Sequence, residues 1–183
     1  MIGYLRGGRI DTQPRTASQT MKRLLIFCCV FLAMGCAAAP ATRPTPIDPA
    51  TAADRAAVIA TVQSLFDAMR TRDTAAIRAA VVPNTQLVSI RIADGAPPRM
   101  QIQPVSAFVA SVGRAPDELV ERMWDPRVEI AGPLASLWAP YDFRIGSSFS
   151  HCGHDAVHLV RTAEGWKIAG ITYTVVTTGC TAP

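Results

Sequence analysis

The sequence has 183 residues, enough for one domain of ordinary size, and 49% of them are hydrophobic against 17% charged, which excludes a disordered polyelectrolyte. The net charge of +4 comes from residues 1–35, which hold five basic side chains and one acidic side chain, whereas residues 36–183 hold 13 of each sign. Nucleic-acid binding needs a clustered basic surface, and the balanced remainder of the chain offers none, so we expect no nucleic-acid partner.

The first 50 residues have the order of an export signal followed by a tether. Lys22 and Arg23 precede an apolar run that is too short to cross a bilayer but is typical of a secretory signal. The run ends in Ala33-Met34-Gly35-Cys36, which resembles a bacterial lipobox. We therefore predict an upstream extension or mis-called start over residues 1–20 and a lipoprotein signal peptide over 21–35. Lipidated Cys36 and a proline-rich tether then occupy residues 36–50.

This leader predicts an exported protein that is anchored to the lipid bilayer through Cys36, on the periplasmic side of the cell envelope. Ala37 is not the aspartate that retains lipoproteins in the inner membrane of enteric bacteria, which favours the outer membrane. The alternative is an ordinary signal peptide that is cut near Ala37–Ala39.

Helical patterns begin the predicted domain, residues 51–183. Thr51 and Asp54 resemble a capping box, and the apolar residues behind them recur on one helical stripe: Val58, Val62, Leu65, Phe66 and Met69. Asp73 is a suitable N-cap for a second helix, and a third helix is expected from Pro104 to Gly113. Alternating residues predict strands over 86–92 and 99–102 between these two helices.

From residue 118 onward the pattern is that of strands. We expect them over 118–130, 133–145, 149–162 and 166–177, with turns at Gly146-Ser147 and Glu164-Gly165. Three helices followed by an antiparallel meander predict an α+β fold, in which the helices pack on one long curved antiparallel sheet.

Two segments carry a family resemblance that covers residues 54–180. The first is VQSLFDAMRTRDTAAIRAAVVPNTQLVSI, which resembles the opening of the nuclear transport factor 2-like superfamily, also called SnoaL-like. The second is WAPYDFRIGSSFSHCGHDAVHLVRTAEGWKIAGITYT, which is similar to the lumazine-binding branch of that superfamily. The resemblance implies a cystatin-like cone with a pocket between sheet and helices, and often a homodimer. It implies no single function, because the fold hosts isomerases, dehydratases, cyclases and non-catalytic binders.

The turn at Gly146-Ser147 sets a register that gathers polar side chains on one face of the sheet. Asp142 then lies opposite His151, and Trp138 lies opposite Asp155. We expect this face to be concave and buried, so that Asp142 and His151 hydrogen-bond. A one-residue slip or a bulge would turn this hairpin inside out.

A loop at Ala163-Glu164 extends the same face to the last strand. Asp155 then lies opposite Thr172, and Leu159 lies opposite Ile168. Because Leu159 and Ile168 are apolar, this register also predicts that the face carrying Asp155 is the buried one.

These residues are candidates for catalysis or binding. His151 with Asp142 or Asp155 could serve as a general acid or base, and Asp155 could be held protonated by an apolar pocket. Trp138, Arg91 and Thr172 are candidate ligand contacts, with Arg91 suited to an anionic substrate. The structural alternatives are that the Asp142–His151 pair and Asp155 merely satisfy local hydrogen bonds, that Trp138 belongs to the core, and that Arg91 is solvated.

No metal site or cofactor is predicted. His154 and His158 share a strand face but lie about 13 Å apart, too far to hold one ion. The sequence contains no phosphate-binding loop, dinucleotide fingerprint or serine nucleophile elbow.

Cys152 and Cys180 remain as an even pair once the cysteines of the leader are set aside. In an exported domain such a pair predicts a disulfide, with two free thiols as the alternative.

Three functions stay open at this point. The first choice is an envelope-anchored domain that binds a small, largely apolar molecule in its pocket. The second is a lyase, isomerase or cyclase that uses His151. The third is a dimeric scaffold with a vestigial pocket.

Overall fold

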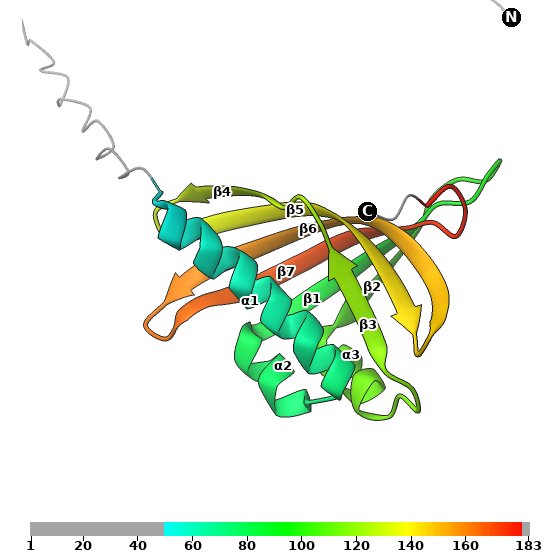
Figure 1. Cartoon of the computed structure of the whole chain (residues 1–183), viewed down its shortest axis with the longest axis horizontal. Helices are drawn as coiled ribbons and strands as arrows, with labels where there is room; N and C mark the ends of the chain where they lie inside the picture. The colour runs from blue at the N-terminus through cyan, green and yellow to red at the C-terminus, as the bar shows by residue number, and fades with distance from the viewer. Residues whose placement is uncertain (1–49, 181–183) are drawn as a thin grey trace, which may run out of the picture. The chain divides into compact units, whose positions relative to one another are not determined.

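The computed structural model describes residues 50–180, which form three helices and a seven-stranded sheet (Figure 1). The predicted signal peptide and the predicted lipidation site at Cys36 lie outside the described residues. The elements in chain order are α1 (Ala52–Thr71), α2 (Thr74–Ala80), β1 (Val81–Arg91), β2 (Arg99–Pro104), α3 (Val105–Gly113), β3 (Leu119–Met123), β4 (Arg127–Ala131), β5 (Leu134–Ile145), β6 (Ser148–Thr162) and β7 (Gly165–Val175).

Helices α1 and α2 begin where their capping residues predict. At the start of α1 the Thr51 hydroxyl accepts from the Asp54 N–H, and the Asp54 carboxylate accepts from the Thr51 N–H, which is a complete capping box. The Asp73 carboxylate accepts from two N–H groups in the first turn of α2. All five apolar residues of the predicted α1 stripe are buried, so this stripe is the face that packs on the sheet.

The sheet is mixed rather than wholly antiparallel. Its strand order is β2-β1-β7-β6-β5-β3, with β4 also paired to β5, and the β1–β7 pair is parallel. The expected strand over 118–130 is divided into β3 and β4, both of which pair with β5. Between them Asp125 has a positive φ of 46° and Pro126 offers no N–H, so the ladder cannot continue through this segment.

A bulge corrects the predicted register of the β5–β6 hairpin. Ile145 lies opposite Ser148 as expected, but the pairing shifts by one residue at Ser150, so that His151 lies opposite Phe143 and Asp142 lies opposite Cys152. The extra residue reverses the phase of β5 relative to β6. The predicted pairing of Asp142 with His151 and of Trp138 with Asp155 is therefore wrong.

A second bulge shifts the β6–β7 pairing by one residue. Leu159 lies opposite Ile168 as predicted, whereas beyond Ala169 Asp155 lies opposite Tyr173 rather than Thr172. The inward face of β7 consequently carries Tyr173, and Thr172 points to the outer face.

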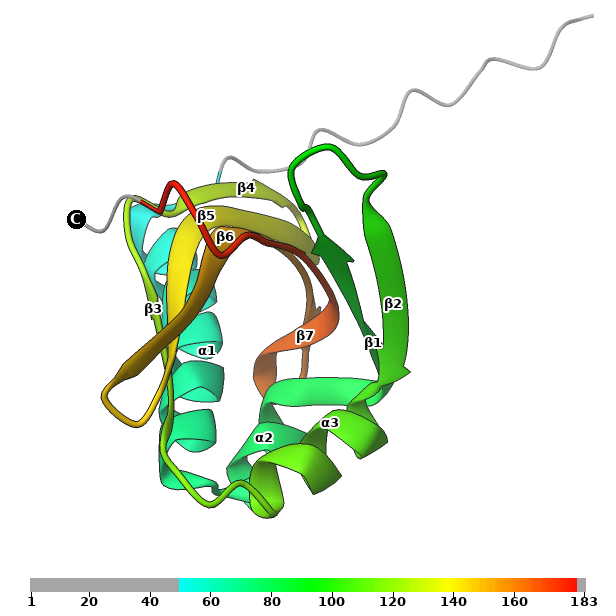
Figure 2. The same ribbon diagram turned by 90° about the vertical axis from the view of Figure 1, so that its right-hand side faces the viewer.

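Figure 2 shows the bent sheet, with α1 lying across its concave side and α2 and α3 at one end. The buried apolar side chains of α1 and α3 meet those of the sheet in this interior. In the described part of the chain, no helix is both long and apolar enough to cross a membrane.

Candidate functional site

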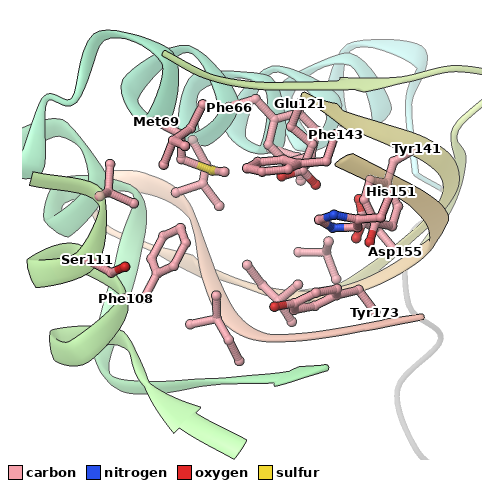
Figure 3. Close-up of a pocket in the computed structure, with 17 residues that line it drawn as sticks. Phe66, Met69, Phe108, Ser111, Glu121, Tyr141, Phe143, His151, Asp155 and Tyr173 are labelled. Atoms are coloured by element: carbon pink, nitrogen blue, oxygen red, sulfur yellow. The ribbon is translucent and has the colours of Figure 1, made fainter. Parts of the chain in front are cut away.

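A pocket of about 300 Å³ lies between the helices and the concave face of the sheet. Most of its lining is apolar: Val62, Leu65, Phe66, Met69, Leu87, Phe108, Val112, Leu119, Phe143, Val157 and Ile171. Figure 3 shows Met69 and Phe108 at one end of this space and Tyr141, His151 and Asp155 at the other. The pocket therefore has a mostly apolar end formed by helices, where Ser111 is the polar exception, and a polar end formed by strands.

Two carboxyl groups face this pocket. Asp155 is only 2% exposed, and its Oδ2 has no protein partner among the described residues. Glu121 reaches the pocket from β3, where it lies opposite Phe143 on the inward face. The side chains of Glu121 and Asp155 lie close enough for each carboxyl group to shift the ionisation of the other.

Burial dominates the ionisation of this carboxyl pair. It raises the pKa of Glu121 well above its ordinary value, and the neighbouring Asp155 raises it further. Burial also raises the pKa of Asp155 to about 7, although the interaction with the Glu121 side chain lowers it in part. Near neutral pH the pair therefore holds at least one proton, and the pair is poised to gain or lose another.

His151 and two tyrosines complete the polar end. The His151 ring lies edge-on to Tyr141 and tilted against Phe143, and its Nδ1 is 2.9 Å from the Ser150 hydroxyl. Burial and then the charge of Arg91 lower the pKa of His151, so the imidazole is neutral near pH 7. Tyr141 donates to the carbonyl oxygen of Thr174, which fixes its ring at the pocket wall.

A second, more polar space of about 170 Å³ adjoins the pocket and shares Leu87, His151 and Tyr173 with it. Its other lining residues come from the inward face of β1 and β2 and the end of β7: Ser89, Arg91, Gln101, Gln103 and Val175. We call this space the vestibule.

Known structures identify the fold. A nuclear transport factor 2-like protein of unknown function from Shewanella baltica matches 72% of this chain over 100% of its own length, with 12% identity and a TM-score of 0.54. A nuclear transport factor 2-like protein from Cytophaga hutchinsonii matches 67% of this chain over 98% of its own length, with 10% identity and a TM-score of 0.56. The domain has the nuclear transport factor 2-like fold.

A third match of this fold comes from Streptomyces avermitilis and carries the provisional name of dehydratase. It covers 69% of this chain and 98% of its own length, with 14% identity and a TM-score of 0.52. No family model matches the sequence, and no curated protein matches it. The lumazine-binding branch stays a prediction.

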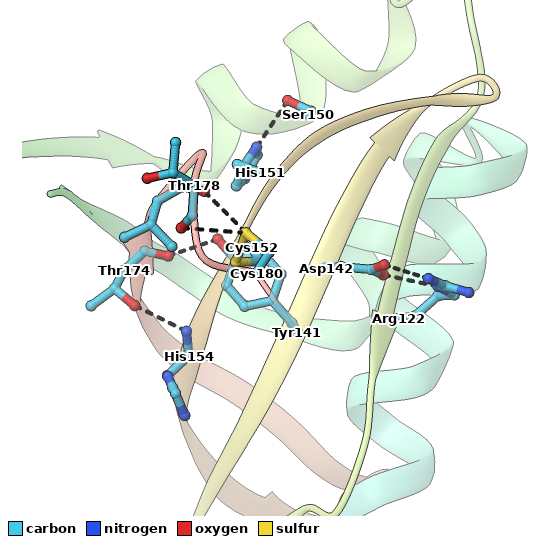
Figure 4. Close-up of a disulfide and its surroundings, with 11 residues drawn as sticks. Arg122, Tyr141, Asp142, Ser150, His151, Cys152, His154, Thr174, Thr178 and Cys180 are labelled. Carbon is cyan, nitrogen blue, oxygen red and sulfur yellow. Dashed lines mark hydrogen bonds and ion pairs between the residues drawn. A yellow bond between two sulfur atoms is a disulfide. The ribbon is translucent and has the colours of Figure 1, made fainter. Parts of the chain in front are cut away.

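Two residues predicted for the site of this nuclear transport factor 2-like domain lie outside the pocket. Asp142 is buried beneath Arg122, which binds both of its carboxylate oxygens and lowers its pKa (Figure 4). Trp138 is 43% exposed and lies against the ring of His154. Because the bulge reversed the phase of β5, both side chains point away from His151, and the proposed Asp142–His151 dyad is wrong.

The other predicted contacts divide between the two faces. His151 and Asp155 line the pocket, and Arg91 lines the vestibule. Thr172 lies opposite Ala156 on the outer face and is not a pocket residue. The sequence prediction does not include Glu121, although alternation with Leu119 and Met123 places it on the inward face of its strand.

The structure contains the expected Cys152–Cys180 disulfide, with the two Cα atoms 5.9 Å apart (Figure 4). Cys152 and Val176 also exchange two backbone hydrogen bonds. Together these contacts attach the segment after β7 to β6, one residue from His151.

Among the described residues, the acidic and histidine side chains do not gather into a metal site. Within residues 50–180, no group of three histidine, cysteine, aspartate or glutamate side chains could hold a metal ion. The chemistry that the described side chains offer is proton transfer and hydrogen bonding.

Proposed function

We propose that this domain binds a small, largely apolar molecule in the pocket between its helices and sheet. The observation that carries the proposal is the pocket itself, which has the size of a small-molecule site and an apolar lining with a few polar groups at one end. Apolar lining favours a ligand with an apolar body, and the protonated carboxyl pair and Tyr173 supply hydrogen bonds to a carbonyl or hydroxyl group.

A blocked pocket should lose binding. Ser111 lines the pocket from α3, and Ser111→Trp places an indole in the space that the ligand needs. We expect the affinity for the neutral dye Nile red, measured by fluorescence titration, to fall at least about tenfold, because most of the buried contact area is lost. Ala107→Trp is the matched control, since Ala107 is exposed on the same helix but does not line the pocket. Equal binding by Ser111→Trp and wild type would contradict the proposal.

The carboxyl pair favours a second candidate function, an isomerase, dehydratase or cyclase that works by general acid–base catalysis. A carboxylate whose pKa is near 7 is well matched to proton abstraction at neutral pH, and a protonated neighbour can donate. The Streptomyces avermitilis match with its dehydratase name is compatible with such chemistry. This candidate replaces the predicted Asp142 with Glu121.

Two variants separate the binder from the enzyme. Native mass spectrometry of protein isolated from its own host would identify a retained ligand and thus a compound to assay. If the protein converts that compound, Asp155→Asn should lower kcat about 100-fold or more, the usual size of a general acid–base contribution, while affinity changes little. In a pure binder, no product forms with wild type, and Asp155→Asn and His151→Ala change affinity only modestly.

We also propose that the domain is held at the cell envelope by a lipid on Cys36. The support is the order of basic residues, apolar run and Gly35-Cys36 in the sequence. Labelling of growing cells with a fatty-acid analogue should mark the wild-type protein, and Cys36→Ser should remove the label. The same label on both proteins would contradict the anchor.

A further inference from the structure

The vestibule differs in chemistry from the pocket that it adjoins. Its polar side chains come from paired positions on β1 and β2, where Leu87 lies opposite Gln103 and Ser89 lies opposite Gln101. The next pair along the same face is Arg91 opposite Arg99. The inward face of this hairpin therefore becomes steadily more polar, and then cationic, with distance from the apolar pocket.

Without a bound anion, the positions of Arg91 and Arg99 on neighbouring strands are electrostatically unfavourable. Like charges directly opposite each other on neighbouring strands destabilise a sheet. None of the ion pairs between described residues includes Arg91 or Arg99. By contrast, Arg122 and Arg161 of the same sheet each pair with an aspartate. An anion beside Arg91 would relieve this repulsion and give the guanidinium an ionic partner.

The charge of Arg91 also reaches the pocket. It acts on the ionisation of His151, Tyr141 and Tyr173, and two of these three residues line both spaces. One molecule could therefore occupy the pocket and extend past His151 to Arg91.

We propose that the vestibule binds an anionic head group, and that the ligand of this domain is an amphipathic acid whose apolar body fills the pocket. This inference rests on the proposed binding function and specifies its ligand class. Arg91 is the principal contact of the head group, a carboxylate or phosphate, with Gln101 and Gln103 as neutral hydrogen-bond donors beside it. The carboxyl pair lies at the pocket side of His151, so that the acid faces Arg91 rather than Glu121 and Asp155.

The experiment compares molecules that share a chain and differ in the head group. Decanoate, decyl phosphate and decanol would be titrated against the Nile red complex of the full domain. We expect at least one acid to bind about tenfold or more tightly than decanol, and the preferred acid identifies the head group. In Arg91→Gln the difference in affinity between the preferred acid and decanol should fall to about twofold, while the affinity for decanol stays unchanged. The difference should also narrow in high salt, because exposed charges are screened.

Arg127→Gln is the matched control, since it removes the same charge from an exposed strand residue that lines neither space. Equal wild-type affinity for decanol and both acids would overturn the inference and leave the apolar pocket standing. If Arg91→Gln keeps the full difference in affinity between acid and decanol, the inference is also overturned, because the head group then binds elsewhere. Failure of all three molecules to displace Nile red would overturn the proposed binding of such chains as well.

Discussion

The domain should become less stable as the pH rises from 4 to 8, because the buried carboxyl pair must then ionise in an apolar pocket. The pKa of Asp155 is raised from 3.8 to about 7, so the folded state holds a proton that the unfolded chain has already lost. Stability from this group is fully present below pH 4 and is lost as the pH rises through 7. This difference between the two pKa values of Asp155 corresponds to about 4 kcal/mol in the free energy of unfolding. Because Asp155 and Glu121 ionise as a pair, the effect belongs to both residues together.

Substitution of the pair should remove this dependence. We expect Asp155→Asn to be more stable than wild type at pH 8 and close to wild type at pH 4, with a larger effect when Glu121→Gln is added. Urea unfolding at each pH measures the difference directly. Comparison at each pH is needed because His151, whose pKa is lowered, acts in the opposite direction below pH 6.5.

Glu129→Gln serves as the control, because Glu129 is an exposed acid on β4 that does not line the pocket. Its variant should follow the wild-type curve. If Asp155→Asn loses the same stability between pH 4 and pH 8 as wild type does, the carboxyl pair is not buried in the way that the structure describes.

Loss of the disulfide should have the second largest effect. Cys152 and Cys180 are separated by 28 residues in sequence, and a loop of this length stabilises a fold by about 3–4 kcal/mol in the chain-entropy model. The Cys152→Ser/Cys180→Ser variant should therefore unfold about 10 °C below wild type in a thermal melt. Peptide mapping without reductant should find the two cysteines linked in wild type.

Cys180→Ser alone separates the cross-link from the packing of Cys152, because it breaks the bond and keeps the buried sulfur. It should lose most of the stability that the double variant loses. A loss of stability below about 1 kcal/mol in both variants would show that the disulfide constrains the unfolded chain little. Two thiols that alkylate freely in the unreduced protein would show that the disulfide does not form.

The sequence predicted the elements of this fold better than their registers. Capping residues and helical spacing place α1 and α2 because both signals act within a few residues. The tight turn before Ser148 likewise fixes the start of the β5–β6 pairing. Beyond it, one extra residue at Ser150 decides which face Asp142 occupies, and no composition signal marks that bulge.

The sequence pattern predicts the candidate site correctly only where it gives the correct strand phase. His151 and Asp155 belong to β6, whose alternation runs unbroken through the pocket, so the pattern places both on the concave face, where the structure has them. Trp138 and Thr172 belong to strands on the far side of a bulge, so the same pattern places them on the wrong face. The Glu121–Asp155 contact joins two strands that are not neighbours in the sheet, so no pairing rule relates them.

The parallel pairing of β1 with β7 has a consequence for the order in which the domain folds. Leu87 pairs with Ile171, far along the chain, whereas β5, β6 and β7 follow one another and pair through short turns. The β1–β2 hairpin can therefore join the sheet only after β7 is in place, and contacts so distant in sequence form slowly. A chain shortened before Gly165 would leave this hairpin without its neighbour and expose its strand edge to other chains.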